Sequence, residues 1–124
     1  MSRFVTPHFR WTEFTDSDTA LEHDIENIPD AYAKANIVRT GRILESVRKE
    51  FGKPLRINSG YRSESLNANI EGASSESYHL EGRAVDINIS GFSDNDVARL
   101  VELLNDHEPV EIYQKGKSYV HVAY

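Results

Sequence analysis

The sequence predicts an α+β fold, in which a small and largely antiparallel sheet is flanked by helices. Apolar residues recur at helical spacing in two stretches, residues 29–51 and the segment that follows Ser93. Shorter stretches at 55–58 and 83–89 have the length and apolar content of strands, and two more lie near the end of the chain. Helices and strands without a regular strand–helix alternation are typical of α+β domains.

The N-terminal part combines an aromatic-rich arm with the longest predicted helix. Residues 1–28 hold several aromatic side chains without clear periodicity, so we expect loops and short turns that wrap an edge of the core. A helix is predicted over residues 29–51, because Pro29 suits a first turn and Gly52 with Pro54 supplies a stop. The residues at helical spacing are Ile37, Gly41, Leu44, Val47 and Phe51.

The middle of the chain holds short strands and short helices. Residues 55–58 are predicted to form a strand, and Ser63 can cap the short helix that follows. A loop of small residues, 72–77, then leads to a second strand over residues 83–89. Ser93, with an acid three residues further on, resembles a capping box and opens the last helix.

The last two predicted strands, at about 110–114 and 118–124, form a hairpin. The sequence between them contains KGK, and a Lys-Gly pair suits a tight connection. The length of the loop stays open at this point. The register therefore stays open as well, and a slip of one residue would turn every side chain to the other face.

Composition limits the partners of the chain. Its 124 residues contain no repeat or low-complexity linker, so we expect residues 1–124 to form one domain. A monomer is expected as well. Cysteine is absent, which excludes disulfides and thiolate metal sites. A formal net charge of -6 argues against nucleic acid as the main partner. No apolar run has the length of a membrane span.

The most informative stretch is SYHLEGRAVDI, residues 77–87, because it places a carboxylate in a strand that otherwise looks buried. Strand alternation puts Val85 and Ile87 on one face, and Ala84 and Asp86 on the other. Burying a carboxylate costs several kcal/mol unless a positive group meets it. Asp86 therefore needs a partner.

The last strand repeats this pattern. His121 shares a face with Tyr119 and Ala123, and His79 lies just before the earlier strand. Two imidazoles and one carboxylate suit zinc and leave a fourth position for an activated water. The residues alone leave a second interpretation open, in which Asp86 pairs with an arginine and both histidines are merely hydrogen-bonded. The histidines expected at the surface are His8, His23 and His107.

The residues around this group fit the motif S-x-H-x-x-G-x-A-x-D. The five specified positions are Ser77, His79, Gly82, Ala84 and Asp86. The motif resembles that of the zinc-dependent D-Ala-D-Ala carboxypeptidases and L-alanyl-D-glutamate endopeptidases, which cut peptidoglycan stem peptides and share a fold with the hedgehog signalling domain. The segments SGYRS, LN and YVHVAY resemble further parts of that family. The N-terminal region is similar to the subgroup found in phages and bacterial genomes.

This resemblance implies a role for each matching residue. The implied ligands of one Zn2+ per chain are His79, Asp86 and His121. Arg62 would stabilise the oxyanion or hold a substrate carbonyl, a role that suits a fixed guanidinium. Ser77 and Tyr61 would lie on the substrate side. Without the resemblance, Arg62 fits an ordinary surface salt bridge.

The chain departs from the family at the positions where other members carry the acid that serves as general base. Several members carry an acid three residues before the last ligand, where this chain has Ser118, and others carry one on the preceding strand, where it has Gln114. Glu111 is the nearest acid on that strand. A three-residue hairpin loop would place Glu111 opposite His121 on the same face. A two-residue loop would pair it with Val120 and leave it a solvated edge charge.

The expected function is that of a zinc peptidase that cleaves stem or cross-link peptides of peptidoglycan by a metal-activated water. The alternatives are a zinc-binding module that recognises muropeptide or a protein partner without cleaving it, and a purely structural metal site. The first residues, MSRFVTPHFRW, lack the apolar run of a signal peptide. We therefore expect a protein made in the cytoplasm that acts on the cell wall, as a phage lysin, a virion module or a host enzyme.

Overall fold

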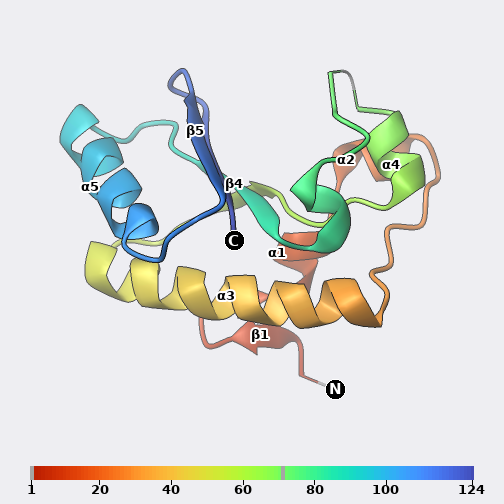
Figure 1. Cartoon of the computed structure of the whole chain (residues 1–124), viewed down its shortest axis with the longest axis horizontal. Coiled ribbons are helices and arrows are strands. Elements are labelled where there is room, and N and C mark those ends of the chain that lie inside the picture. The colour runs from red at the N-terminus through yellow and green to blue at the C-terminus, as the bar shows by residue number, and fades with distance from the viewer. Residues whose placement is uncertain (1, 71) are drawn as a thin grey trace.

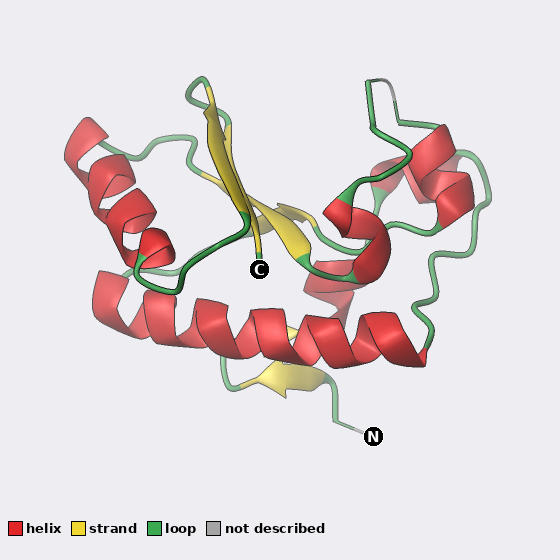
Figure 2. Cartoon of the chain, in the orientation of Figure 1, coloured by secondary structure: helices red, strands yellow, loops and turns green. Residues whose placement is uncertain are grey.

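The computed structural model describes residues 2–70 and 72–124, and it has the predicted α+β architecture (Figure 1). The larger sheet has four antiparallel strands in the order β3-β4-β6-β5, and β1 pairs with β2 in a separate sheet (Figure 2). The strands are β1 Phe4–Thr6, β2 Phe9–Arg10, β3 Ile57–Ser59, β4 Ala84–Asn88, β5 Glu111–Lys115 and β6 Tyr119–Ala123. The helices are α1 Trp11–Thr15, α2 Asp18–Glu22, α3 Ala31–Phe51, α4 Glu64–Ala68, the 3-10 helix η1 Tyr78–Glu81 and α5 Asp94–Asn105.

Helix α3 crosses the whole molecule, with β1 on one side of it and the larger sheet on the other (Figure 1). It begins later than predicted, because Asp30 is its N-cap and accepts a hydrogen bond from the backbone N–H of Ala33 at 2.8 Å. Pro29 therefore precedes the helix. Gly52 ends it in the left-handed conformation, as predicted. In the described part of the chain, neither α3 nor any other helix is long and apolar enough to cross a membrane.

The N-terminal arm covers part of the core, as predicted, but it is more regular than loops and turns. It forms the β1–β2 hairpin and the short helices α1 and α2. Phe9 and Phe14 are fully buried and belong to the same core cluster as the apolar face of α3. The backbone N–H of Tyr61 donates to the carbonyl of Phe14 at 2.6 Å, which ties the arm to the segment after β3.

Strands β4 and β6 have one aliphatic face and one polar face, as their alternation predicts. Val85, Ile87 and Val120 are fully buried in the core. Asp86 pairs directly with His121 across the two strands, so their side chains stand on the same face of the sheet. The ends of the predicted strands shift by one or two residues, and the caps at Ser63 and Ser93 form as predicted.

The β5–β6 hairpin has a three-residue loop, residues 116–118, closed by the pair Lys115 and Tyr119. Counting back from that closing pair places Tyr113, and not Glu111, opposite His121. The expectation that a three-residue loop sets Glu111 opposite His121 is therefore wrong. Glu111 is opposite Ala123, two residues further along β6. Because side chains alternate with a period of two, Glu111 still stands on the same face as His121.

Candidate metal centre

Three secondary-structure elements bring the predicted ligand residues together. His79 comes from η1, Asp86 from β4 and His121 from β6. One ligand-type atom from each lies within 4.8 Å of the other two, so the group could hold a metal ion. The three side chains are only 3%, 8% and 4% exposed. Burial on this scale requires that each polar atom has a partner.

The 3-10 helix η1 fixes the position of His79. Ser77 caps this helix, because its Oγ accepts a hydrogen bond from the backbone N–H of His79 at 3.2 Å. Gly82 ends it in the left-handed region, and a Cβ at that position would lie 2.6 Å from the carbonyl oxygen of Ala33. Only glycine therefore allows η1 to pack against α3 in this way.

The hydrogen bonds of His79 also select its tautomer. Nδ1 lies 2.7 Å from the carbonyl oxygen of Gly60. A carbonyl oxygen can only accept, so Nδ1 carries a hydrogen, and in the neutral ring Nε2 keeps its lone pair. That nitrogen faces Asp86 Oδ1 at 3.3 Å.

His121 contacts a carboxylate through each of its ring nitrogens. Nδ1 lies 2.8 Å from Asp86 Oδ1, and Nε2 lies 2.5 Å from Glu111 Oε1. The ring of Tyr113 stacks on the imidazole with centroids 4.5 Å apart and 14° between the planes. The imidazole is therefore held at both nitrogens and on one face.

Arg62 supplies the arginine partner that the second interpretation of Asp86 required. Its Nη2 lies 3.6 Å from Asp86 Oδ2, while its Nε donates to Ser59 Oγ at 3.2 Å and its Nη1 to Asn67 Oδ1 at 3.4 Å. The arginine contact is compatible with a metal site, because Arg62 approaches one carboxylate oxygen and both histidines approach the other.

Burial and the close contacts within the group shift the pKa values of Asp86, His121 and Arg62. Burial by itself would raise the pKa of Asp86, but its contacts with His121 and His79 lower it to about 2. Burial would lower the pKa of His121, and the hydrogen bonds and charges of Asp86 and Glu111 raise it instead. Burial lowers the pKa of Arg62, against the opposing effect of Asp86. Asp86 is therefore ionised at neutral pH.

The donor set fits a divalent metal. When His79 is neutral, its Nε2 keeps a lone pair and faces an ionised oxygen of Asp86, so two electron-rich atoms meet in a buried space. Such atoms repel each other unless a proton or a cation lies between them. Two imidazole nitrogens with one carboxylate form a ligand set that zinc accepts, and three protein ligands leave a position open.

His79, Asp86 and His121 line an open polar cleft of about 340 Å3, which we call the cleft. Arg62 and Ser77 line it, as expected of residues near a substrate, and so do Glu76, Tyr113 and Tyr119. Glu76, Tyr113 and Tyr119 were not predicted from the sequence as cleft residues. Strand alternation places Tyr113 on the same face as Glu111. That face could be matched to His121 only once the register of the hairpin was known.

The predicted substrate residue Tyr61 lies elsewhere, and so do Ser118 and Gln114, the positions at which family members carry an acid. Tyr61 packs against the hydrophobic core and is not among the described residues that line the cleft. Ser118 is exposed in the hairpin loop, and the side chain of Gln114 donates to the carbonyl of Gly116. The substrate contact predicted for Tyr61 stays a prediction.

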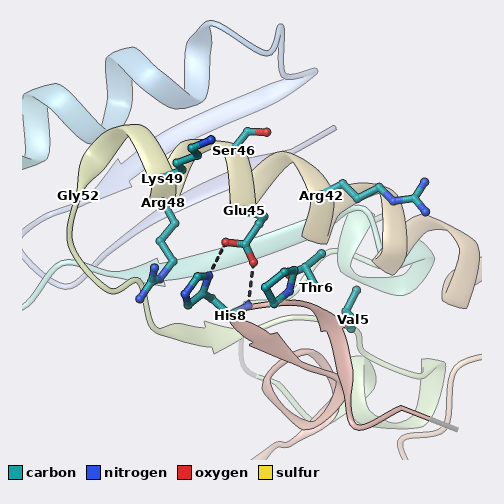
Figure 3. Close-up of a pocket in the computed structure, with 10 residues that line it drawn as sticks. Val5, Thr6, His8, Arg42, Glu45, Ser46, Arg48, Lys49 and Gly52 are labelled. Atoms are coloured by element: carbon teal, nitrogen blue, oxygen red, sulfur yellow. Dashed lines mark hydrogen bonds and ion pairs between the residues drawn. The ribbon is translucent and has the colours of Figure 1, made fainter.

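A larger cavity, of about 860 Å3, lies between the β1–β2 turn and the second half of α3 (Figure 3). We call it the β1–α3 groove. Its titratable centre is the pair of His8 and Glu45: the backbone N–H of His8 donates to Oε1, and its Nδ1 lies 2.8 Å from Oε2. The described residues form no group of metal-binding type there. His8, His23 and His107 are exposed, as predicted.

An α+β domain with a buried His-Asp-His group at an open polar cleft has the arrangement of a mononuclear metal-dependent hydrolase. The sequence profile of the family named Peptidase M15 matches residues 7–123. The chain belongs to the peptidase M15 family. This confirms the family resemblance, while the phage and bacterial subgroup stays a prediction.

One curated relative is the zinc D-Ala-D-Ala carboxypeptidase of Streptomyces albus G. It is 34% identical to this chain over 98 residues. The aligned region covers 75% of this chain but only 37% of the relative, so the chain spans little more than a third of that enzyme.

Proposed function

We propose that this protein is a zinc-dependent peptidase that cleaves stem or cross-link peptides of peptidoglycan. The observation that carries the proposal is the convergence of His79, Asp86 and His121 beside Arg62 in an open cleft. Membership of the peptidase M15 family supports the reaction type. The name of the Streptomyces albus G relative supports both zinc and a D-Ala-D-Ala peptide as the substrate class.

The proposed ligands of one zinc ion are His79, through the bare Nε2, Asp86, and His121 through Nδ1. Zinc in that position supplies Lewis acidity, which polarises a peptide carbonyl and lowers the pKa of a water molecule. The protein's own contribution begins with burial, because the low exposure of the three side chains strengthens every electrostatic interaction in the cleft.

Arg62 is proposed to hold the carbonyl oxygen of the scissile bond as negative charge develops on it. Its side chain is 12% exposed and is held by Ser59, Asn67 and Asp86, so the guanidinium lines the cleft in a fixed orientation. A pre-oriented donor of this kind needs no rearrangement during the reaction. Ser77 lines the same cleft and is proposed to contact the substrate.

The first experiment combines metal analysis with digestion of purified sacculi. We expect about one zinc per chain by mass spectrometry, on the argument that three ligand residues form one site. We also expect release of peptides or loss of cross-links, which a chelator abolishes. Mass spectrometry of the released fragments identifies the bond and separates trimming of ends from opening of internal bonds. Absence of zinc would contradict the proposal.

A second function is favoured by one observation. The hairpin position at which several family members carry an acid is Ser118, which is exposed in the loop. A hydroxyl is a poor base near neutral pH. A zinc-binding module that holds muropeptide without cleaving it would retain zinc, bind soluble stem peptides and leave sacculi intact. Peptide release from sacculi would exclude it.

We further propose that the protein acts at the cell wall as a monomer, as a phage lysin, a virion module or a host enzyme. The proposed peptide substrate supports this place of action, because such peptides occur in the wall. Sedimentation of the purified protein tests the monomer.

A further inference from the structure

Glu111 contacts His121 through the ring nitrogen that does not face Asp86. Its Oε1 lies 2.5 Å from Nε2 of His121, whereas Asp86 Oδ1 lies 2.8 Å from Nδ1. Glu111 is opposite Ala123 in the β5–β6 ladder, so it reaches His121 diagonally over a small side chain. Its own side chain is 45% exposed, which makes it the solvated end of a contact whose other end is buried.

The two histidines need opposite tautomers in order to point a lone pair at the same place. His79 has its hydrogen on Nδ1, held by the carbonyl of Gly60, and offers Nε2 toward Asp86. His121 turns Nδ1 toward Asp86 instead. It can offer that nitrogen to a metal only if the hydrogen is on Nε2. Glu111 is the acceptor at that nitrogen.

We propose that Glu111 is a positioning residue, which holds His121 in the Nε2–H tautomer and turns Nδ1 toward the metal. Tyr113, stacked on the ring, restrains the same imidazole from its face. Outer carboxylates that accept the second N–H of a ligand histidine fix its orientation and raise its basicity. The inference rests on the proposed function for the presence of zinc. It gives Glu111 a different role from the proton transfer predicted from the sequence.

The geometry separates these two roles. A general base must reach the water molecule that attacks the substrate, on the side of the ligand atoms. Glu111 lines the cleft, but its carboxylate contacts Nε2 of His121, the ring nitrogen that does not face Asp86. In this position the carboxylate acts on the reaction through His121.

Two substitutions at one position test the proposal. Glu111→Gln keeps a carbonyl oxygen that can accept the Nε2 hydrogen but removes the basicity, whereas Glu111→Ala removes both. We expect Glu111→Ala to weaken zinc binding by roughly 10- to 100-fold, the usual effect of losing such a partner. Glu111→Gln should keep zinc affinity and kcat within a few fold of wild type. Zinc affinity is measured by competition with a chromophoric chelator.

A matched control and a spectroscopic readout make the test specific. Glu76 lines the same cleft, and no hydrogen bond joins it to His121 among the described residues, so Glu76→Ala should leave zinc affinity unchanged. Two-bond 1H–15N spectra should show His121 as the Nε2–H tautomer in the zinc-loaded wild type and in Glu111→Gln. In Glu111→Ala the metal-free protein, at alkaline pH where imidazole is neutral, should shift to the Nδ1–H tautomer, because Asp86 is then the acceptor that remains at Nδ1.

Two results would overturn the inference. One is a loss of turnover in Glu111→Gln equal to that in Glu111→Ala, with zinc affinity and tautomer unchanged, which would make Glu111 the proton-transfer group. The other is a Glu111→Ala variant with wild-type zinc affinity and wild-type tautomer. A wild-type protein that binds no zinc would contradict the proposed function, and the tautomer in the metal-free variants would still decide the role of Glu111.

Discussion

Two histidine–carboxylate contacts of the same length lie in different regions of the molecule. In the cleft, Nδ1 of His121 lies 2.8 Å from Asp86 Oδ1, and in the β1–α3 groove Nδ1 of His8 lies 2.8 Å from Glu45 Oε2. The surroundings differ. The side chain of His8 is 51% exposed, and that of His121 is 4% exposed.

The difference shows that neither the contact distance nor the size of the cavity marks the functional site. Glu45 uses both oxygens on one residue, His8, whose side chain is half exposed. Such a surface pair contributes about 0–1 kcal/mol to stability. In the smaller cleft, one oxygen of Asp86 is shared by two buried imidazoles. Only protons or a cation can lie between that oxygen and the two imidazole nitrogens. The two regions should therefore respond differently to substitution.

The largest effect is expected from Asp86→Ala. This change removes the proposed ligand that faces both imidazoles, so zinc and peptidase activity should be lost together. The loss of zinc affinity should exceed the roughly 10- to 100-fold typical of an outer-shell partner. Metal content and sacculus digestion are measured on the same preparation. A variant that keeps zinc with wild-type affinity would return Asp86 to a structural ion pair.

The same variant also tests the purely structural reading of the metal group. Zinc that binds only the folded state stabilises it by about 2.7 kcal/mol at a concentration 100 times its Kd. The melting temperature of the wild type should therefore rise with zinc, and that of Asp86→Ala should not. Equal melting temperatures of metal-free and zinc-loaded wild type would mean that zinc does not bind the folded state preferentially, which would contradict a structural and a catalytic ion alike.

Arg62→Ala should separate turnover from metal binding. Removing one pre-oriented oxyanion donor typically lowers kcat by roughly 100- to 1,000-fold, while the three proposed ligands stay in place. Arg62→Lys should not restore the rate, because a lysine cannot reproduce the contacts with Ser59 and Asn67. Arg48→Ala, in the β1–α3 groove, is the matched control. Full activity of Arg62→Ala would refute the oxyanion assignment.

Zinc affinity should fall as the pH is lowered. Burial alone would lower the pKa of His121, but Asp86 and Glu111 raise it, so a proton competes with zinc for Nδ1 at a pH above the ordinary histidine range. Affinity should drop by roughly tenfold per pH unit for each competing proton. Asp86, with a pKa of about 2, stays ionised throughout and adds nothing to the slope. A flat profile across the histidine range would contradict the assignment of His121 as a ligand.

Local periodicity explains how much of the centre the sequence could predict. Asp86 and His121 were placed on polar strand faces because alternation depends only on neighbouring residues, and the two residues are direct partners in the ladder. His79 followed from the motif, although the 3-10 helix that carries it was not predicted. One turn of 3-10 helix is too short to leave a periodic signal.

The rest of the centre depends on long-range geometry. The contact of Glu111 with His121 required the length of the hairpin loop, and Tyr113 became visible as a stacking partner only with the true register. The approach of Arg62 to Asp86 joins a loop to a strand, and nothing in the local sequence encodes it. The β1–β2 hairpin was missed because its strands have only three and two residues.

The smallest effect is expected from His8→Ala. Burial alone would raise the pKa of Glu45, but its hydrogen bonds with His8 lower it. The stabilisation from Glu45 is therefore present above the ordinary pKa of a glutamate, and it is lost as the pH falls through the lowered value in the folded state. Because the pair is solvated, we expect His8→Ala to reduce the free energy of unfolding by less than about 1 kcal/mol.

Zinc content and turnover of His8→Ala should equal those of the wild type, and Glu45→Gln should behave in the same way. The measurements are urea unfolding above and below the ordinary pKa of glutamate, together with the zinc and sacculus assays. If either variant lost zinc or activity, the groove would be coupled to the cleft through α3, which packs against both β1 and η1. The contrast between a solvated pair and a buried metal group would then no longer separate the two regions.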